Sequence, residues 1–304
     1  MTALKPYHNF NLRNFNTFRV DSIAKTVYFP NTVESFIELL SELDDYVILG
    51  GGSNVILSST GIDKTVILTT MLDKIELEDN ILKVTAGVKG AYLARYAMEN
   101  SLSGFEFLTP IPCTIGGAIY QNAGAHGMSI SDTFKSALVW DKLYKKTFEL
   151  TKEDMNFSYR NSILKNNRYT VLEATFELEK APKEEIKTRM DEIVEKRKYS
   201  QPSLKTPNAG SIFKNPENNS AGKLIEAIGI KGTAIGGAKI SELHGNFIIN
   251  KNFAKSWDIL ELMFFAYNKV KENYNITLHP EVIFIGEMTD KEEKIWKILQ
   301  NQAI

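Results

Sequence analysis

The sequence predicts an α+β protein of about two domains, on three grounds. The chain has 304 residues, and a domain commonly contains roughly 150 residues. The first part is rich in short strand-like runs, whereas the part after residue 182 mixes amphipathic helices with short strands. Hydrophobic residues make up 43% of the chain and charged residues 24%, a balance typical of globular proteins. We expect the domain boundary near Lys180-Ala181-Pro182.

The first elements form a β-α-β pattern that leads into a run of glycines. Lys25–Phe29 is expected to be a strand, and Asn31, with Glu34 three residues further on, is expected to cap the next helix. Tyr46–Leu49 is a short apolar strand, and Gly50–Asn54 follows it directly. This order predicts a β-α-β unit whose second strand ends in a glycine loop.

The other elements follow from the spacing of apolar residues. A helix is expected at about 90–99, and the two prolines in Gly104–Pro112 favour an extended, rigid segment. Residues 183–198 should form a charged helix whose inner face holds Ile186, Met190, Ile193 and Val194. The remaining expected strands lie at 55–57, 64–69, 74–78, 80–86, 134–141, 145–150, 170–178, 246–249 and 281–285. The remaining expected helices lie at about 219–228, 256–273 and 290–302.

The composition excludes several classes of function. Lys and Arg number 36 and Asp and Glu number 37, so no bulk positive field attracts nucleic acid or an anionic membrane. No apolar run approaches the roughly 18–20 residues that span a bilayer, and the N-terminal segment lacks the apolar region of a secretion signal. We therefore expect a soluble, cytoplasmic protein with no nucleic-acid partner and no membrane insertion.

The cysteine and histidine content gives no support for a metal centre. The single cysteine, Cys113, excludes an intramolecular disulfide and a zinc site built on cysteine pairs. The four histidines show neither H-E-x-x-H nor H-x-H spacing. We expect no metal.

The glycines gather in three clusters. Four lie in residues 50–61, four in 116–127 and five in 229–245, and none lies between Gly127 and Gly210. Glycine tolerates positive φ and lets a ligand approach the main chain closely. Main-chain N–H groups of a glycine turn can also bind an anion without a cationic side chain. The two clusters in the strand-rich part therefore predict a dinucleotide held by backbone groups, with a purely structural turn as the alternative.

Two common nucleotide-binding motifs are absent. The residue three positions after Gly52 is Val55, and a strand follows, so the first cluster is not a Rossmann fingerprint. The pair Gly222-Lys223 is followed by Leu224, so it is not a Walker A loop. Any dinucleotide must be bound in another way.

Ordered motifs along the chain resemble the UDP-N-acetylenolpyruvoylglucosamine reductase family. The strand-rich part is similar to the FAD-binding half of that family in Asn16–Arg19, Leu49–Asn54, Leu108–Ala125 and Tyr159-Arg160. The second part is similar to its substrate domain in Gly210–Pro216, Ala221–Ile225, Lys231-Gly232, Ile235–Ala238, Asn246–Asn250 and Pro280–Val282. The matches run from about residue 16 to residue 286, so the set is far more specific than any one motif.

The resemblance implies a fold, a cofactor and a reaction. It implies an FAD-binding fold of the vanillyl-alcohol-oxidase (PCMH) type over residues 1–181, with subdomains at about 1–68 and 69–181. A C-terminal α/β substrate-binding domain is implied over residues 182–304. FAD is expected to bind non-covalently, with NADPH as co-substrate and a UDP-sugar as substrate. The family acts in peptidoglycan synthesis, and the short spacing between its motifs here resembles the subclass without an extra substrate-covering loop.

Three residues match the catalytic positions of the family. Ser211 stands at the proton donor, Arg160 at the arginine that contacts the substrate carboxylate, and Glu281 at the catalytic acid. Arginine binds a carboxylate with two hydrogen bonds and stays charged, and a protonated carboxyl can donate a hydrogen bond. Serine is a weak acid, so it serves as a proton donor only toward a strongly basic carbon.

The resemblance also implies binding residues. The expected cofactor-binding residues, in the first two glycine clusters and near them, are Leu49, Gly50, Gly51, Gly52, Ser53, Asn54, Pro110, Ile111, Thr114, Gly116, Gly117, Ala118, Asn122, Gly124 and Ala125. The expected substrate-binding residues are Lys214, Asn215 and His244, although a lone histidine is more often structural. The third glycine cluster receives no assigned contact.

One departure and two rival functions stay open. Cys113 stands where the family usually has glycine, so a covalent flavin link is an alternative to a simple replacement by a small residue. A sugar or alcohol oxidase of the same fold should lack Gly210–Pro216 together with Pro280-Glu281. A non-catalytic nucleotide-binding module predicts that the residues at 160, 211 and 281 are degraded, whereas all three are intact.

Overall fold

The computed structural model describes residues 4–301, which fall into two compact units that interleave along the chain. Unit 1 contains Val27–Gly51, Val66–Arg197 and the described residues before Tyr7. Unit 2 contains Tyr7–Thr26, Gly52–Thr65 and the described residues from Lys198 onward. This partition differs from the linear division at residue 181, because two early segments pack with the last third of the chain.

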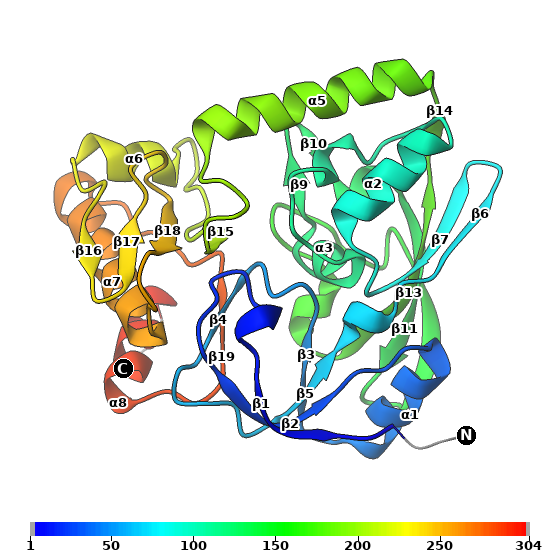
Figure 1. Cartoon of the computed structure of the whole chain (residues 1–304), viewed down its shortest axis with the longest axis horizontal. Coiled ribbons are helices and arrows are strands. Elements are labelled where there is room, and N and C mark those ends of the chain that lie inside the picture. The colour runs from blue at the N-terminus through cyan, green and yellow to red at the C-terminus, as the bar shows by residue number, and fades with distance from the viewer. Residues whose placement is uncertain (1–3, 302–304) are drawn as a thin grey trace. The chain divides into compact units, whose positions relative to one another are not determined.

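The main sheet of unit 1 is antiparallel and has the strand order β12-β11-β13-β7-β6. Its strands are β6 (Ile75–Glu78), β7 (Ile81–Thr85), β11 (Phe134–Asp141), β12 (Lys146–Thr151) and β13 (Tyr169–Glu177). Helices α2 (Gly90–Glu99) and α3 (Ile115–Gln121) share one apolar core with this sheet. Figure 1 shows β6 and β7 as a hairpin at the edge of the unit. The expected strands and the expected helix at 90–99 are confirmed.

The predicted β-α-β unit is also present. Strand β2 (Ile23–Tyr28) runs parallel to β5 (Thr65–Leu68), and β5 lies between β2 and β3 (Tyr46–Leu49). Helix α1 (Val33–Glu42) connects β2 to β3. Its N-cap is Thr32, whose hydroxyl accepts a hydrogen bond from the Ser35 N–H, so the cap expected at Asn31 is wrong. Thr32 caps the helix instead because Ser35, three residues further on, accepts a hydrogen bond from the Thr32 N–H in return.

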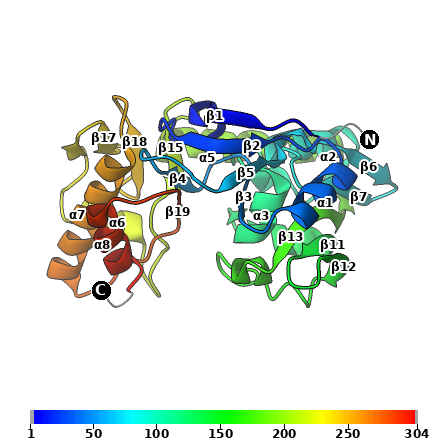
Figure 2. The same cartoon turned by 90° about the horizontal axis from the view of Figure 1, so that it is seen from below.

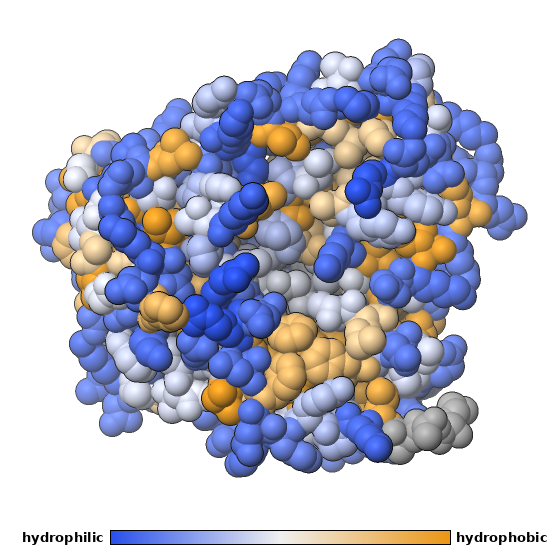
Figure 3. Space-filling model, in the orientation of Figure 1, coloured by the Kyte–Doolittle hydropathy of each residue, from blue (hydrophilic) through white to orange (hydrophobic). Residues whose placement is uncertain are grey.

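The long charged helix α5 (Lys183–Ser200) has a narrower apolar face than expected. Ile186, Met190 and Ile193 are buried, at spacings of four and three residues, but Val194 is 44% exposed. Figure 3 shows the outer side of this helix as mostly hydrophilic. The smaller elements of unit 1 are β8 (Leu102–Ser103), β9 (Gly124–Ala125), β10 (Met128–Ser129), α4 (Ile130–Thr133) and β14 (Glu179–Lys180).

Unit 2 contains a four-stranded antiparallel sheet, a parallel strand pair and three helices. The sheet has the order β15-β18-β17-β16, with β15 (Asn208–Ser211), β16 (Ala234–Ile235), β17 (Ala238–Ile240) and β18 (Phe247–Asn250). The parallel pair joins β4 (Val55–Leu57) to β19 (Ile283–Ile285). The helices are α6 (Ala221–Ala227), α7 (Ser256–Tyr274) and α8 (Asp290–Leu299), and Figure 2 shows α7 and α8 side by side. Strand β1 (Tyr7–Asn11) lies next to β2.

The third glycine cluster has a structural purpose in unit 2. Gly236 has φ +51, and a methyl group there would lie 2.1 Å from Asp258 Oδ1. The Asp258 carboxylate accepts hydrogen bonds of 3.0 Å from the N–H groups of Gly237 and Lys255, just before α7. The absence of a side chain at Gly236 therefore leaves space for the Asp258 carboxylate, which accepts from the main chain at the start of α7 and from the turn at Gly237.

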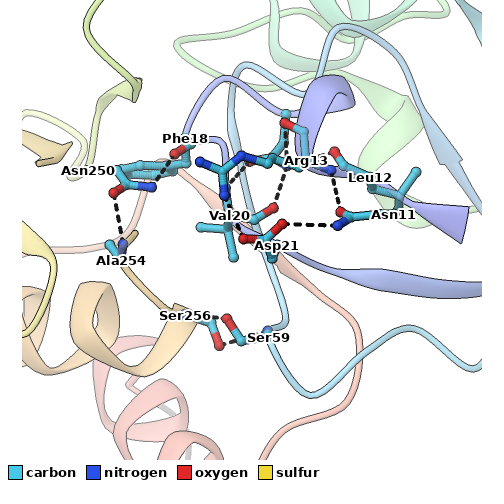
Figure 4. Close-up of polar contacts among 11 residues, drawn as sticks. Asn11, Leu12, Arg13, Phe18, Val20, Asp21, Ser59, Asn250, Ala254 and Ser256 are labelled. Atoms are coloured by element: carbon cyan, nitrogen blue, oxygen red, sulfur yellow. Dashed lines mark hydrogen bonds and ion pairs between the residues drawn. The ribbon is translucent and has the colours of Figure 1, made fainter. Parts of the chain in front are cut away.

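Buried polar contacts attach the N-terminal segment to the rest of unit 2, as Figure 4 shows. Asn250 Nδ2 donates to the Phe18 carbonyl at 2.8 Å, and Asn250 Oδ1 accepts from the Ala254 N–H at 2.8 Å. Within the N-terminal segment itself, Arg13 forms a part-exposed ion pair with Asp21 at 2.5 Å. Within residues 4–301, no helix is both long enough and apolar enough to cross a membrane.

Candidate active site

The main chain of the first glycine loop packs closely against other main-chain segments at Gly51 and at Gly52. In unit 2, Gly52 has φ +60, and a methyl group there would lie 2.1 Å from the Phe15 carbonyl oxygen. The Thr17 N–H donates to the Gly52 carbonyl at 3.0 Å. In unit 1, a methyl group on Gly51 would lie 2.9 Å from the Pro112 carbonyl oxygen. Glycine is therefore required here for the close approach of two main-chain segments, the structural reason that the sequence analysis left open, and the approach of a ligand to this loop stays a prediction.

The first two glycines of the second cluster lie in a helix and not in the loop that the glycines suggested. Gly116 and Gly117 lie in the first turn of α3. Glycine costs about 1 kcal/mol in a helix, but here it permits close packing, because a methyl group on Gly116 would lie 3.0 Å from Ala86 Cβ. The segment before it also differs from the expected extended form, since Glu106–Leu108 makes one turn of 3₁₀ helix.

The two glycine clusters meet at Thr114, and the residues there fit a bound dinucleotide. A methyl group on Gly50 would lie 2.2 Å from Thr114 Oγ1, so only glycine fits beside this hydroxyl. The Thr114 hydroxyl is buried and has no hydrogen-bond partner within residues 4–301. Because buried hydroxyls are nearly always hydrogen-bonded, this one indicates a polar ligand that would complete it. The same holds for the Thr109 hydroxyl, five residues earlier.

The other expected cofactor-binding residues differ in exposure. Those that are buried are Leu49, Gly52, Pro110, Ala118 and Asn122. Those that are half-buried are Gly50, Gly51, Ser53, Asn54, Ile111, Gly116, Gly124 and Ala125. Gly117 is exposed. Direct contact of each with the cofactor stays a prediction.

Arg160 lies on a tight turn that is attached to the second glycine cluster in unit 1. Ser158 and Asn161 exchange main-chain hydrogen bonds of 3.2 and 3.1 Å, and Arg160 between them has φ +53. Arg160 Nη2 donates to the Gly124 carbonyl at 3.1 Å. Asn122 Nδ2 donates to the Ser158 carbonyl at 3.0 Å. Two expected cofactor-binding residues thus support the turn that carries the expected catalytic arginine.

Ser211 lies at a β-bulge in unit 2. Strand β15 pairs with β18 so that Asn208 faces Ile249 and Ser211 faces Phe247, which leaves one extra residue on β15. Gly210 has φ +74, and its N–H donates to Asn208 Oδ1 at 2.9 Å. A bulge re-aims the neighbouring side chains, and such bulges are common beside active sites. The short strand β15 was not predicted, because four residues containing a glycine carry no clear alternation.

Glu281 lies within the same backbone network as Ser211. The Glu281 N–H donates to the Ile212 carbonyl at 2.8 Å. The Glu281 carbonyl accepts a hydrogen bond of 3.1 Å from Asn54 Nδ2. Two expected catalytic residues and one expected cofactor-binding residue therefore lie together in unit 2.

Asn246 is a site residue to which the sequence assigned no role. Its buried carboxamide accepts from the Phe213 N–H at 2.9 Å and donates to the Phe213 carbonyl at 2.7 Å. Its own carbonyl accepts from the Ile212 N–H at 2.9 Å. These three bonds hold the segment that follows Ser211 in place. A contact over more than 30 residues leaves no local pattern that would have revealed it.

The three expected substrate-binding residues have structural contacts in unit 2. The Lys214 N–H donates to the His279 carbonyl at 2.9 Å, and Asn215 Oδ1 accepts from the Ala221 N–H at 3.1 Å, at the first residue of α6. His244 Nδ1 accepts from the Asn246 N–H at 3.1 Å, so the proton of the neutral ring lies on Nε2. Substrate contacts of these residues stay predictions.

Burial lowers the pKa of His244 from its ordinary 6.5, and the repulsion from Lys231 acts in the same direction, while Glu226 opposes both. Above pH 6.5 both the folded and the unfolded chain carry a neutral ring. As the pH falls below 6.5, the unfolded chain takes up the proton more readily, so the free energy of unfolding decreases. We expect His244→Gln to lose less stability than the wild type between pH 8 and pH 5, measured by urea unfolding. Equal acid losses in both proteins would contradict the assignment.

Cys113 is buried beside Gly90 and is expected to be unreactive in the folded protein. Burial raises the pKa of its thiol to about 12. Because only the thiolate reacts, iodoacetamide should label the native protein at least about 1,000-fold more slowly than the unfolded chain at pH 7. Mass spectrometry of timed samples measures both rates. Rapid labelling of the native protein would reopen a covalent flavin link, which an inert thiol disfavours.

Comparisons with known proteins agree on one family. Residues 24–143 match the model of the FAD binding domain, and residues 201–285 match the model of the UDP-N-acetylenolpyruvoylglucosamine reductase C-terminal domain. The UDP-N-acetylenolpyruvoylglucosamine reductase of Caldicellulosiruptor bescii is 42% identical over 282 residues, which are 91% of this chain and 89% of that protein. That of Clostridium novyi is 40% identical over 287 residues, which are 93% of each chain.

A solved structure extends the comparison to the fold. The crystal structure of UDP-N-acetylenolpyruvylglucosamine reductase from Thermus caldophilus matches with a TM-score of 0.79 at 31% identity. The match covers 93% of this chain and 98% of that one. The expected α+β fold, an FAD-binding part followed by a C-terminal domain, is confirmed. With two relatives at 40% identity or more along nine-tenths of its length, the chain belongs to the UDP-N-acetylenolpyruvoylglucosamine reductase family of flavin-binding oxidoreductases.

Proposed function

We propose that the protein reduces UDP-N-acetylglucosamine enolpyruvate to UDP-N-acetylmuramate with NADPH, in cytoplasmic synthesis of the peptidoglycan precursor. The observation that carries the proposal is the backbone network of unit 2, which joins Ser211 and Glu281 through the bond from the Glu281 N–H to the Ile212 carbonyl. When bound, FAD accepts a hydride from NADPH and supplies a hydride to the β-carbon of the enolpyruvyl group.

Arg160 and Glu281 would make the substrate accept that hydride. An ordinary enol ether resists hydride, but here the carboxylate in conjugation with it takes up the developing negative charge. Arg160 would bind this carboxylate with two hydrogen bonds and keep its positive charge beside it. Glu281, protonated beside the same carboxylate, would donate a further hydrogen bond. Both contacts strengthen as charge develops, which is the condition for a rate acceleration.

Ser211 would supply the proton that completes the reaction. The enediolate formed by hydride addition is strongly basic at the α-carbon, so a serine hydroxyl is acidic enough to protonate it. The product thereby gains a hydride at the β-carbon and a proton at the α-carbon, and the serine oxygen regains its proton from water. The ammonium group of Lys214, three residues along the chain, would stabilise the transient alkoxide.

We assign contacts with the UDP-sugar to Lys214, Asn215 and His244. Asn215 uses its Oδ1 to accept from the Ala221 N–H, so its Nδ2 is the group that would donate to the substrate. His244 would donate through Nε2, because its Nδ1 accepts from the Asn246 N–H. These assignments predict that both side chains act on substrate affinity through a donated hydrogen bond.

An absorbance experiment on the purified protein tests the proposal. We expect a yellow protein whose flavin is released into the supernatant by acid precipitation. NADPH should bleach the flavin rapidly, whereas a free sugar or alcohol should leave the oxidised spectrum unchanged. Bleaching by a sugar alone would identify an oxidase instead, and a colourless protein that FAD cannot reconstitute would identify a non-catalytic module.

A further inference from the structure

We propose that Asn54 is a positioning residue for Glu281, and that the glycine loop thereby sets the place of the acid that acts on the substrate. This inference rests on the proposed function, in which Glu281 donates to the substrate carboxylate. Asn54 is the last residue of the glycine loop, immediately before β4. Its Nδ2 donates to the Glu281 carbonyl at 3.1 Å, across 227 residues of sequence.

The peptide groups on either side of Glu281 are each held by a hydrogen bond from a different segment of the chain. On one side, the Glu281 N–H donates to the Ile212 carbonyl at 2.8 Å, in the residue that follows Ser211. On the other side, the Glu281 carbonyl accepts from Asn54. The first bond ties Glu281 to Ser211, and the second ties it to the glycine loop. Removing the second bond cuts this link between Glu281 and the glycine loop and leaves its main-chain bond to the Ser211 segment in place.

The strand pairing explains why Asn54 reaches Glu281. Strands β4 and β19 are parallel, with Val55 opposite Ile283, so both begin at the same edge. The Ile283 N–H donates to the Asn54 carbonyl at 3.0 Å, which places the Asn54 side chain beside the residues just before β19. The asparagine side chain supplies an N–H donor at this position, and that donor satisfies the Glu281 carbonyl.

The same geometry predicts which step depends on Asn54. Its carboxamide nitrogen gives one of its two N–H groups to the Glu281 carbonyl, and we expect the contact of Asn54 with the flavin to come from its main chain, which a substitution by alanine retains. We therefore expect Asn54→Ala to leave the FAD dissociation constant and the rate of bleaching by NADPH within about threefold of wild type. The limiting rate of reoxidation by the enolpyruvyl substrate should fall about 10- to 100-fold, as expected for a reacting group displaced by about 1 Å. The substrate dissociation constant should change little.

Four further proteins, the single variant Glu281→Gln among them, make the experiment decisive. Asn54→Asp keeps the size but replaces the donor by an acceptor, so it should show the same selective loss and serves if Asn54→Ala does not retain FAD. Asn250→Ala removes a comparable buried bond, from Asn250 Nδ2 to the Phe18 carbonyl, and should lower the melting temperature without changing the ratio of the two half-reaction rates. In the Glu281→Gln background, Asn54→Ala should slow reoxidation by less than about twofold further, because Asn54 acts through the carboxyl that is already lost.

The outcomes separate this inference from the function on which it rests. Normal reoxidation by Glu281→Gln would refute the role of Glu281 itself. A strong defect of Glu281→Gln together with normal reoxidation by both Asn54 variants would refute only the positioning role. Weakened FAD binding by Asn54→Ala, or full additivity with Glu281→Gln, would show that Asn54 is a cofactor ligand or a general structural residue.

Discussion

Ser211→Ala should still be reduced by NADPH at the wild-type rate, but its reduced flavin should not be reoxidised by the enolpyruvyl substrate. The hydroxyl is the proposed proton source for the α-carbon, and alanine offers no proton at that position. We expect reoxidation to slow by at least about 1,000-fold, the upper part of the range for loss of a general acid. Stopped-flow absorbance follows the two half-reactions separately. The separation matters because a folding defect would slow both.

A neighbouring serine provides the control for this experiment. Ser203 is an exposed residue of unit 2 that accepts a hydrogen bond from the Lys205 N–H. Ser203→Ala should behave as wild type in both half-reactions. Reoxidation of Ser211→Ala within tenfold of the wild-type rate would remove Ser211 from the proposed mechanism. The bulge and Gly210 would then be structural features only.

Gly52→Ala is expected to have the second large effect, on cofactor binding and stability. The added methyl group would lie 2.1 Å from the Phe15 carbonyl oxygen and 2.7 Å from Asn16 Cα, and neither backbone atom can move independently. The strain of φ +60 adds to this clash. Because overpacking of this kind is costly, we expect a loss of about 3 kcal/mol of stability and a rise of about 100-fold in the FAD dissociation constant. Thermal unfolding and flavin fluorescence titration measure the two effects.

Gly127→Ala is the matched control for Gly52→Ala. Gly127 also has a positive φ, +81, but a methyl group there would have no atom within 4 Å. This variant should lose about 1 kcal/mol from backbone strain and keep its FAD affinity. If Gly52→Ala behaved like Gly127→Ala, close backbone approach would not be the reason for glycine in the first loop.

The elements that local patterns govern could be predicted to within a residue or two. Tyr46–Leu49, Val55–Leu57 and Gly90–Glu99 were predicted with the bounds that the structure has. Some predictions were wrong where packing between distant residues outweighed a local sequence preference. Helix α3 was missed because its two glycines suggest a loop, whereas packing of Gly116 on Ala86 outweighs the low helix propensity.

The candidate site was predictable in its residues but not in its connections. The motifs around Arg160, Ser211 and Glu281 marked the positions, yet nothing in them showed the parallel pairing of β4 with β19. That pairing joins segments more than 220 residues apart, and no local periodicity encodes it. The hydrogen bond from Asn54 to Glu281 depends on this strand pairing, so the sequence could not predict it either.

In the proposed reaction, this chain passes reducing equivalents from NADPH to an enolpyruvyl UDP-sugar. The most direct measurement mixes anaerobic, NADPH-reduced protein with one equivalent of UDP-N-acetylglucosamine enolpyruvate and records the flavin spectrum, followed by mass spectrometry of the product. We expect full return of the oxidised flavin absorbance and one equivalent of UDP-N-acetylmuramate, heavier than the substrate by two hydrogens. A flavin that stays reduced until oxygen is admitted, with the substrate recovered unchanged, would contradict the proposed reaction.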